Sequence, residues 1–329
     1  SLHDALPISG SSAGGLDKTG AGTLTLTGGT GGYTGPTTVT AGLLDVGAAT
    51  DLNASTAFNI DGGELQTNAA AQLNDAATVT MTGGTLDVNA AETIGGLSGT
   101  AGTVTIDGGD LTVADGGGNT FAGSINGGGG VTLTTGTQTL TGNSAVAGTM
   151  LMNGGTLILD SGALTNAALL DIDNGEIRLV NGGAVNQLAN DVVVDLADDV
   201  DALLNLNNFD EQIGELLGGG GTGGNVDLGS GRLVISDGNG NTYSGIIGVG
   251  GDSGALELNA GNQTLAGDSE YTGETQIDGG ALILGAAASL DSLSFDINAG
   301  ELRLGGPNQL DNAAVVDLAN NAAALFNLN

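Results

Sequence analysis

A short phrase recurs along this chain of 329 residues: glycine, any residue, an apolar residue, any residue, and a second apolar residue. Neighbouring copies usually lie 20 to 26 residues apart. Alternating apolar positions are typical of a strand with one buried face, and glycine lets the chain turn a corner before that strand. Repeats of this length predict a parallel β-solenoid, whose coils bury apolar side chains against one another. Copies begin at Gly42, Gly84, Gly109, Gly155, Gly175, Gly231, Gly254, Gly280 and Gly300, with a shortened copy at Gly63.

A longer period lies above this one. The phrase Gly175–Leu179 recurs as Gly300–Leu304, an offset of 125 residues. We therefore predict one solenoid over residues 16–329, made of about three super-repeats: 16–127, 128–252 and a truncated 253–329. Residues 1–15 share nothing with the repeat and hold the only histidine, His3, so we predict an atypical leader, a cloning or sequencing remnant followed by a linker. Because the third copy stops unfinished at Asn329, we expect a piece of a longer protein.

The charge balance excludes several functions. The chain has 37 acidic and 4 basic residues, a formal net charge of −33. Four basic residues are too few to neutralise a phosphate backbone, and we therefore expect no nucleic-acid partner. They are also too few to form a polybasic patch that binds a membrane. The chain has no cysteine, which excludes a disulfide framework and a zinc–thiolate site. No apolar run approaches the roughly 20 residues of a membrane-spanning helix.

Residues 251–254, Gly-Asp-Ser-Gly, spell the nucleophile turn of chymotrypsin-like proteases. A serine nucleophile needs a base that takes its proton. The sole histidine, His3, lies in the leader, so we interpret this segment as a solvated corner between coils.

Two further segments partly match the sequence patterns of a phosphate-binding loop and a calcium-binding loop. Gly218, Gly220 and Gly223 fit a phosphate-binding glycine pattern, but residues 225–228 look like a strand where that pattern needs a helix. Residues 237–241 resemble the start of a calcium loop that lacks glycine at its sixth position and glutamate at its twelfth, and their equivalents at 115–119 are weaker still. We predict no dedicated metal, cofactor or catalytic residues and leave weak adventitious calcium binding open.

Carboxylates are abundant enough to suggest a β-helix enzyme that degrades polysaccharides through paired acids. The candidate acids recur in register, however, as expected for parts of the coil. Two of them are each followed two residues later by arginine, which predicts an exposed Glu–Arg pair worth less than about 1 kcal/mol. The equivalent residues are Glu176 and Glu301, Arg178 and Arg303, and Asp171 and Asp296.

The tyrosines and the Thr-x-Thr pairs suggest binding of sugars and of ice, respectively, but neither pattern is sufficient for that function. Tyr33, Tyr243 and Tyr271 are too few for a platform that stacks sugars. Thr-x-Thr pairs resemble those of ice-binding solenoids, but the pairs skip coils, so ordinary β-propensity explains them. These pairs are Thr23/Thr25, Thr103/Thr105 and Thr132/Thr134.

Residues 16–28, followed by Tyr33-Thr34-Gly35, Thr38-Val39 and Gly42, resemble the passenger-associated β-strand repeat of bacterial autotransporters. Residues 119–125 and 241–247 are similar to the segment that precedes this repeat, and Tyr271–Gly273 with Thr275 is a partial match. The later copies have no lysine equivalent to Lys18. The resemblance implies a right-handed parallel β-helix, elongated, with about 14 or 15 coils, displayed on or released from a Gram-negative outer membrane.

The expected function is a non-catalytic stalk or adhesin segment of a surface-exposed or secreted passenger. The alternative is the polysaccharide-degrading β-helix enzyme, a lyase or glycosidase. Expected partners are host-cell surface or matrix components, or further copies of the chain itself. We expect contact with the membrane only through a C-terminal barrel that this sequence lacks.

Overall fold

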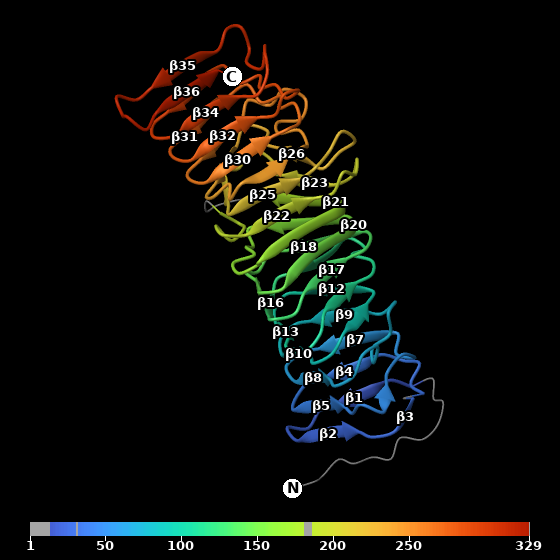
Figure 1. The fold of residues 1–329 in the computed structure, drawn as a ribbon. Helices are drawn as coiled ribbons and strands as arrows, with labels where there is room; N and C mark the ends of the chain where they lie inside the picture. The colour runs from blue at the N-terminus through green and yellow to red at the C-terminus, as the bar shows by residue number, and fades with distance from the viewer. Residues whose placement is uncertain (1–13, 31, 181–185, 329) are drawn as a thin grey trace. The chain divides into compact units, whose positions relative to one another are not determined.

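The structure is a computed structural model that describes residues 14–30, 32–180 and 186–328 (Figure 1). Most of the predicted leader, including His3, lies outside the described residues. The described residues form strands and turns without a helix, and the strands pair in parallel to build a β-solenoid of about 15 turns. The predicted fold class is therefore confirmed. None of the described segments is a helix that could cross a membrane.

The chain divides into two units: unit 1 comprises residues 1–158 and 162–167, and unit 2 residues 159–161 and 168–329. In both units, a strand pairs in register with its equivalent on the next coil. The register sets the coil length, which ranges from 18 residues, where Thr85 pairs with Thr103, to 27 residues, where Glu176 pairs with Leu203. The division into super-repeats stays a prediction.

Unit 1 has three rows of parallel strands, with one short extra pair on its first two coils, β3 (Gly29–Thr30) and β6 (Thr50–Asp51). The first row comprises β1 (Leu16–Lys18), β4 (Thr37–Val39), β7 (Ala57–Ile60), β9 (Thr78–Met81), β12 (Gly96–Gly99), β15 (Asn119–Phe121) and β18 (Thr137–Leu140). The second comprises β2 (Thr23–Leu26), β5 (Leu43–Val46), β8 (Glu64–Thr67), β10 (Thr85–Val88), β13 (Thr103–Ile106), β16 (Ser124–Gly127) and β19 (Ala145–Val146). The third comprises β11 (Glu92–Ile94), β14 (Leu111–Val113), β17 (Val131–Leu133) and the start of β20 (Thr149–Asp160).

Unit 2 begins with β21 (Leu169–Val180), which pairs with two later strands, β22 (Val193–Leu196) and β23 (Leu203–Asn205). The row that starts at β22 continues with β25 (Glu215–Gly218), β28 (Asn241–Tyr243), β30 (Asn262–Leu265), β32 (Ala281–Leu284), β34 (Glu301–Leu304) and β36 (Leu325–Leu328). The strand β23 pairs with β26 (Asn225–Asp227). A further row comprises β24 (Glu211–Ile213), β27 (Arg232–Ile235), β29 (Ala255–Leu258), β31 (Glu274–Ile277), β33 (Ser294–Ile297) and β35 (Val315–Leu318).

Aliphatic side chains stack in columns inside each coil. In unit 1, Leu44, Leu65, Leu86 and Val104 pair in register on four successive coils, and all four are fully buried. The residues between them on each strand point outward, which is the alternation that the recurring phrase predicts. Burial of one such side chain contributes about 1.5 to 3 kcal/mol, so the columns are the main source of stability.

In several copies of the phrase, glycine is needed at the start for two reasons. Gly84 and Gly280 have φ angles of +68° and +70°, a region that other residues enter at a cost. A Cβ atom at either position would also collide with a backbone carbonyl of the preceding coil, that of Gly63 or Gly261. The corner glycine therefore sets both the turn and the close stacking of coils.

Replacing Gly280 by alanine is expected to lower the free energy of unfolding of unit 2 by about 2 kcal/mol or more. The matched control is Gly251→Ala, because Gly251 also has a positive φ, +83°, but has nothing within 4 Å of the added Cβ. In the control, only the unfavourable φ angle should lower the free energy of unfolding, by about 1 kcal/mol. Urea unfolding of both variants measures the difference, and equal losses would show that close stacking of coils imposes no extra cost.

Candidate functional site

The protease-like segment, residues 251–254, lies in a corner of unit 2. The Asp252 carboxylate accepts hydrogen bonds from the backbone N–H groups of Leu228, at 2.9 Å, and Gly229, at 3.0 Å. No histidine lies among the described residues to serve as a base for Ser253. The structure thus uses Asp252 to hold the turn of the preceding coil.

The glycine-rich segment between Gly218 and Gly223 is a loop whose backbone groups are already engaged. Gly220 donates its N–H to the Gly223 carbonyl at 2.9 Å. The Asp198 carboxylate accepts from the N–H groups of Thr222 and Gly223. Strand β26 follows, as expected, so the loop lacks the helix that a phosphate-binding loop needs.

The two calcium-loop-like segments are turns in which an aspartate accepts a backbone hydrogen bond. Asp237 accepts the Asn239 N–H at 3.0 Å, and Asp115 accepts the Gly117 N–H at 2.9 Å. Within the described ranges, no group of three or more histidine, aspartate or glutamate side chains is arranged to hold a metal ion.

The predicted Glu–Arg pairs form as expected. Arg178 and Glu176 are 2.6 Å apart, as are Arg303 and Glu301. The glutamates also accept from neighbouring coils, Glu176 from the Asn205 amide and Glu301 from Asn327. These carboxylates therefore act as ties between coils.

The other candidate acids lie in register with further acids. Asp171 pairs with Asp195 on the next coil, and Asp296 pairs with Asp317. Burial, together with the charges of Asp173 and Asp195, raises the pKa of Asp171. Stacked aspartates of this kind occupy regular outward positions of the strands rather than facing each other across a cleft.

The three tyrosines belong to the interior. Tyr243 donates its hydroxyl to the Gly224 carbonyl at 2.6 Å, and the hydroxyl groups of Tyr271 and Thr275 are 2.7 Å apart. Tyr33 is only 7% exposed. None of them presents a ring for stacking on a sugar.

The threonines stack as single columns. Thr93, Thr112 and Thr132 lie in register on three successive coils. The pair Thr103/Thr105 is flanked by Thr85/Asp87 on one side and Ser124/Asn126 on the other. The Thr-x-Thr pairs therefore do not repeat on adjacent coils here, as expected from the sequence.

Buried glutamates form a polar device that the sequence reasoning missed; we call it the Glu clasp. In unit 1, Glu92 is 2% exposed, and its carboxylate accepts the backbone N–H groups of Gln72 and Leu73 on the preceding coil. In unit 2, Glu211 is 1% exposed and accepts from Gln187 at 2.8 Å and Leu188 at 3.1 Å. Burial raises the pKa of both glutamates from 4.5 to about 7. A shared spacing could have revealed the clasp: Gln-Leu, then Glu-x-Ile-Gly about one coil later.

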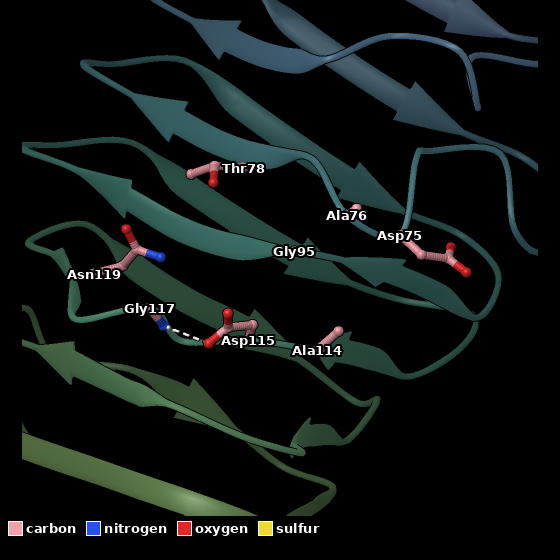
Figure 2. A pocket seen from close by; sticks show the side chains of 8 residues that line it. All are labelled: Asp75, Ala76, Thr78, Gly95, Ala114, Asp115, Gly117 and Asn119. Atoms are coloured by element: carbon pink, nitrogen blue, oxygen red, sulfur yellow. Dashed lines mark hydrogen bonds between the residues drawn. The ribbon is translucent and has the colours of Figure 1, made fainter.

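A hollow of about 410 Å³ opens on unit 1 beside the Glu92 clasp. Figure 2 shows Thr78, Ala76 and Asp75 along one side, and Asn119, Gly117 and Asp115 along the other, with Gly95 between them. Three successive coils supply this lining, at the turns that lead into β9, β12 and β15. A neighbouring hollow of about 280 Å³ shares Asp75 and is otherwise lined by Asn53, Ala71 and Asn74.

Two segments, residues 16–46 and 258–284, match the family model of the passenger-associated-transport repeat. These two segments are thus similar to passenger repeats. These matches confirm the resemblance, since the two segments include residues 16–42 and 271–275, on which it was based. The chain is also 35% identical over 150 residues to the adhesin BmaC autotransporter of Brucella suis biovar 1 (strain 1330). That alignment covers 41% of this chain and 4% of the relative. No solved structure matches the chain.

Hydroxyl groups tie the first matched segment, residues 16–46, to the following coil. The Thr37 and Ser55 hydroxyl groups are 3.0 Å apart, and Ser55 also donates to the Gly35 carbonyl. In the second copy, Thr275 meets Tyr271, and Ser292 donates to the Gly273 carbonyl at 2.7 Å. Each matched segment thus bonds to a serine of the following coil, Ser55 or Ser292. Passenger repeats imply a secreted or cell-surface location.

Proposed function

We propose that the chain is a non-catalytic, adhesive stalk segment of an autotransporter passenger that extends from the bacterial outer membrane. The observation that carries the proposal is the stacked solenoid bearing passenger repeats, in which two of the acids suspected of catalysis, Glu176 and Glu301, accept hydrogen bonds from a neighbouring coil. The related protein from Brucella suis is named an adhesin, which supports the adhesive part.

The composition suits export of an unfolded chain. No cysteine is present to form disulfides during passage, and a net charge of −33 keeps the unfolded chain soluble. Because each strand pairs with its equivalents on the adjacent coils, coils can fold one after another outside the cell. The partners we propose are host-cell surface or matrix components, or other copies of the chain.

Adherence of cells that display the chain tests this proposal. A bacterium without adhesins of its own, carrying the chain on a surface anchor, is expected to bind host cells or matrix more than the same bacterium with the anchor alone. Equal binding would leave a passive spacer and contradict the adhesive role. Incubation of the purified protein with acidic and neutral glycans tests the non-catalytic part, and any glycan cleavage would overturn it.

A further inference from the structure

Next to the hollow on unit 1, a repeated corner lacks one side chain. Residues 92–97, Glu-Thr-Ile-Gly-Gly-Leu, correspond to residues 211–216, Glu-Gln-Ile-Gly-Glu-Leu. Gly96 therefore stands where unit 2 has Glu215. The segment from Asp115 to Asn119 corresponds in the same way to the segment from Asp237 to Asn241.

In unit 2, the carboxylate of Glu215 fills this corner. Its oxygens accept hydrogen bonds from the side-chain amides of Asn239, at 3.0 Å, and Asn241, at 2.6 Å. The amide groups of this corner are thus shown, within the same chain, to bind an oxygen acceptor placed between them and the preceding coil.

In unit 1, the matching amide has no such acceptor. Asn119 occupies the position of Asn241, and its Nδ2 atom lies over Gly96, where a Cβ would meet it. Among the residues that the structure describes, the side chains of Asn119, Thr78 and Asp75 make no hydrogen bond to protein. Asp115 uses one carboxylate oxygen for the Gly117 N–H. The hollow therefore offers an amide donor, a hydroxyl group and two carboxylates.

These groups select the chemistry of a ligand. The amide of Asn119 needs an acceptor oxygen, whereas the carboxylates of Asp75 and Asp115 accept only from donors. An anion would be repelled by the two carboxylates, and a simple cation would leave the amide unpaired. A neutral molecule with several hydroxyl groups satisfies both sides, because each hydroxyl donates and accepts. The volume of about 410 Å³ lies within the range of roughly 300 to 1,000 Å³ typical of small-molecule sites.

We propose that this hollow binds a neutral sugar ring, and that Asn119 and Asp115 hold its hydroxyl groups. Asp75 lies at the other end of the hollow, where it also lines the neighbouring one. The neighbouring hollow shares Asp75 and has space for a second ring of the same glycan. This inference rests on the proposed adhesive function and names the ligand class of one site within it.

The test places a glutamate at position 96, since Glu215 occupies the equivalent corner of unit 2. Purified wild-type chain is titrated with maltotriose, lactose, mannotriose and chitotriose, and the NMR signal of the Asn119 side-chain amide is followed. At least one of these sugars is expected to shift that signal. Gly96→Glu is expected to weaken binding of that sugar at least tenfold, about 1.4 kcal/mol. The new carboxylate would accept the hydrogen bond of the Asn119 side-chain amide, which is then no longer free to bind the sugar. Asn119→Ala leaves the backbone turn intact but lacks the reporting amide, so its binding is measured by isothermal titration calorimetry beside the wild type, and it is expected to be weakened similarly.

The matched control is Glu215→Gly, which empties the equivalent corner of unit 2 and is expected to leave binding at Asn119 unchanged. Thermal unfolding confirms that each variant is folded. The inference is overturned if none of the four sugars shifts the Asn119 signal, or if binding survives in Gly96→Glu. It is also overturned if sialyllactose or glucosamine binds in preference to the neutral sugars. If no sugar binds at Asn119 but cells that display the chain still adhere, this site is refuted and the proposed function stands.

Discussion

Replacing Glu211 by alanine is expected to lower the free energy of unfolding of unit 2 by about 3 kcal/mol at neutral pH. The Glu211 carboxylate is 1% exposed and accepts the backbone N–H groups of Gln187 and Leu188. Without it, two donors of the preceding coil stay buried, and a cavity replaces the side chain. Each unsatisfied buried donor costs about 1 to 3 kcal/mol. Urea unfolding followed by circular dichroism measures the change.

The control for this prediction is Asp291→Ala in the same unit. The Asp291 side chain is exposed, so its removal is expected to change the free energy of unfolding by no more than about 0.5 kcal/mol. Glu92→Ala is expected to reproduce the loss in unit 1, where the same clasp recurs. A Glu211 variant as stable as the Asp291 variant would mean that the clasp contributes nothing.

Acidification from about pH 8 to about pH 5 is expected to stabilise the fold, by up to about 3 kcal/mol for each clasp glutamate. Burial raises the pKa of Glu92 and Glu211 from 4.5 to about 7 in the folded protein. Between these two values the folded state binds more protons than the unfolded state, so stability falls as pH rises through this window. Burial raises the pKa of Asp171, Asp195 and Asp227 in the same direction.

Two comparisons isolate the clasp from the general repulsion of a chain with a net charge of −33. Exposed charges are screened by salt, whereas buried groups are screened much less. The stabilisation on acidification should therefore persist in 0.5 M salt, and it should shrink in Glu211→Ala, which has lost one of the titrating groups. A fold that becomes less stable between about pH 8 and pH 5 would contradict the prediction.

The coil itself could be predicted from the sequence because its physics is local and repeated. A glycine at a corner and two apolar residues at alternate positions are enough to define a buried column such as Leu44, Leu65 and Leu86. The Glu–Arg ties were predictable for the same reason, since residues two apart on a strand point to the same side.

The Glu clasp and the hollow were not predicted, for different reasons. Glu92 lies two residues before Ile94 on β11, so the alternation places it inside, but its partners are backbone N–H groups, whose only signal in the sequence is a Gln-Leu pair about one coil earlier. The unoccupied amide beside the hollow depends on the glycine at position 96, which looks like any other glycine until it is compared with Glu215. Only the fold shows that the turns before β9, β12 and β15 meet at one place.

Disulfide trapping between neighbouring coils tests the parallel stack most directly, because the chain has no cysteine of its own. Thr85 and Thr103 are partners in register on β10 and β13, and adjacent strands lie about 4.8 Å apart, within the range a disulfide spans. The double variant Thr85→Cys/Thr103→Cys is expected to form the bond under mild oxidation. Thr85→Cys/Thr105→Cys, displaced by two residues, is expected not to. Cross-linking of the second pair in preference to the first would contradict the stacked coils.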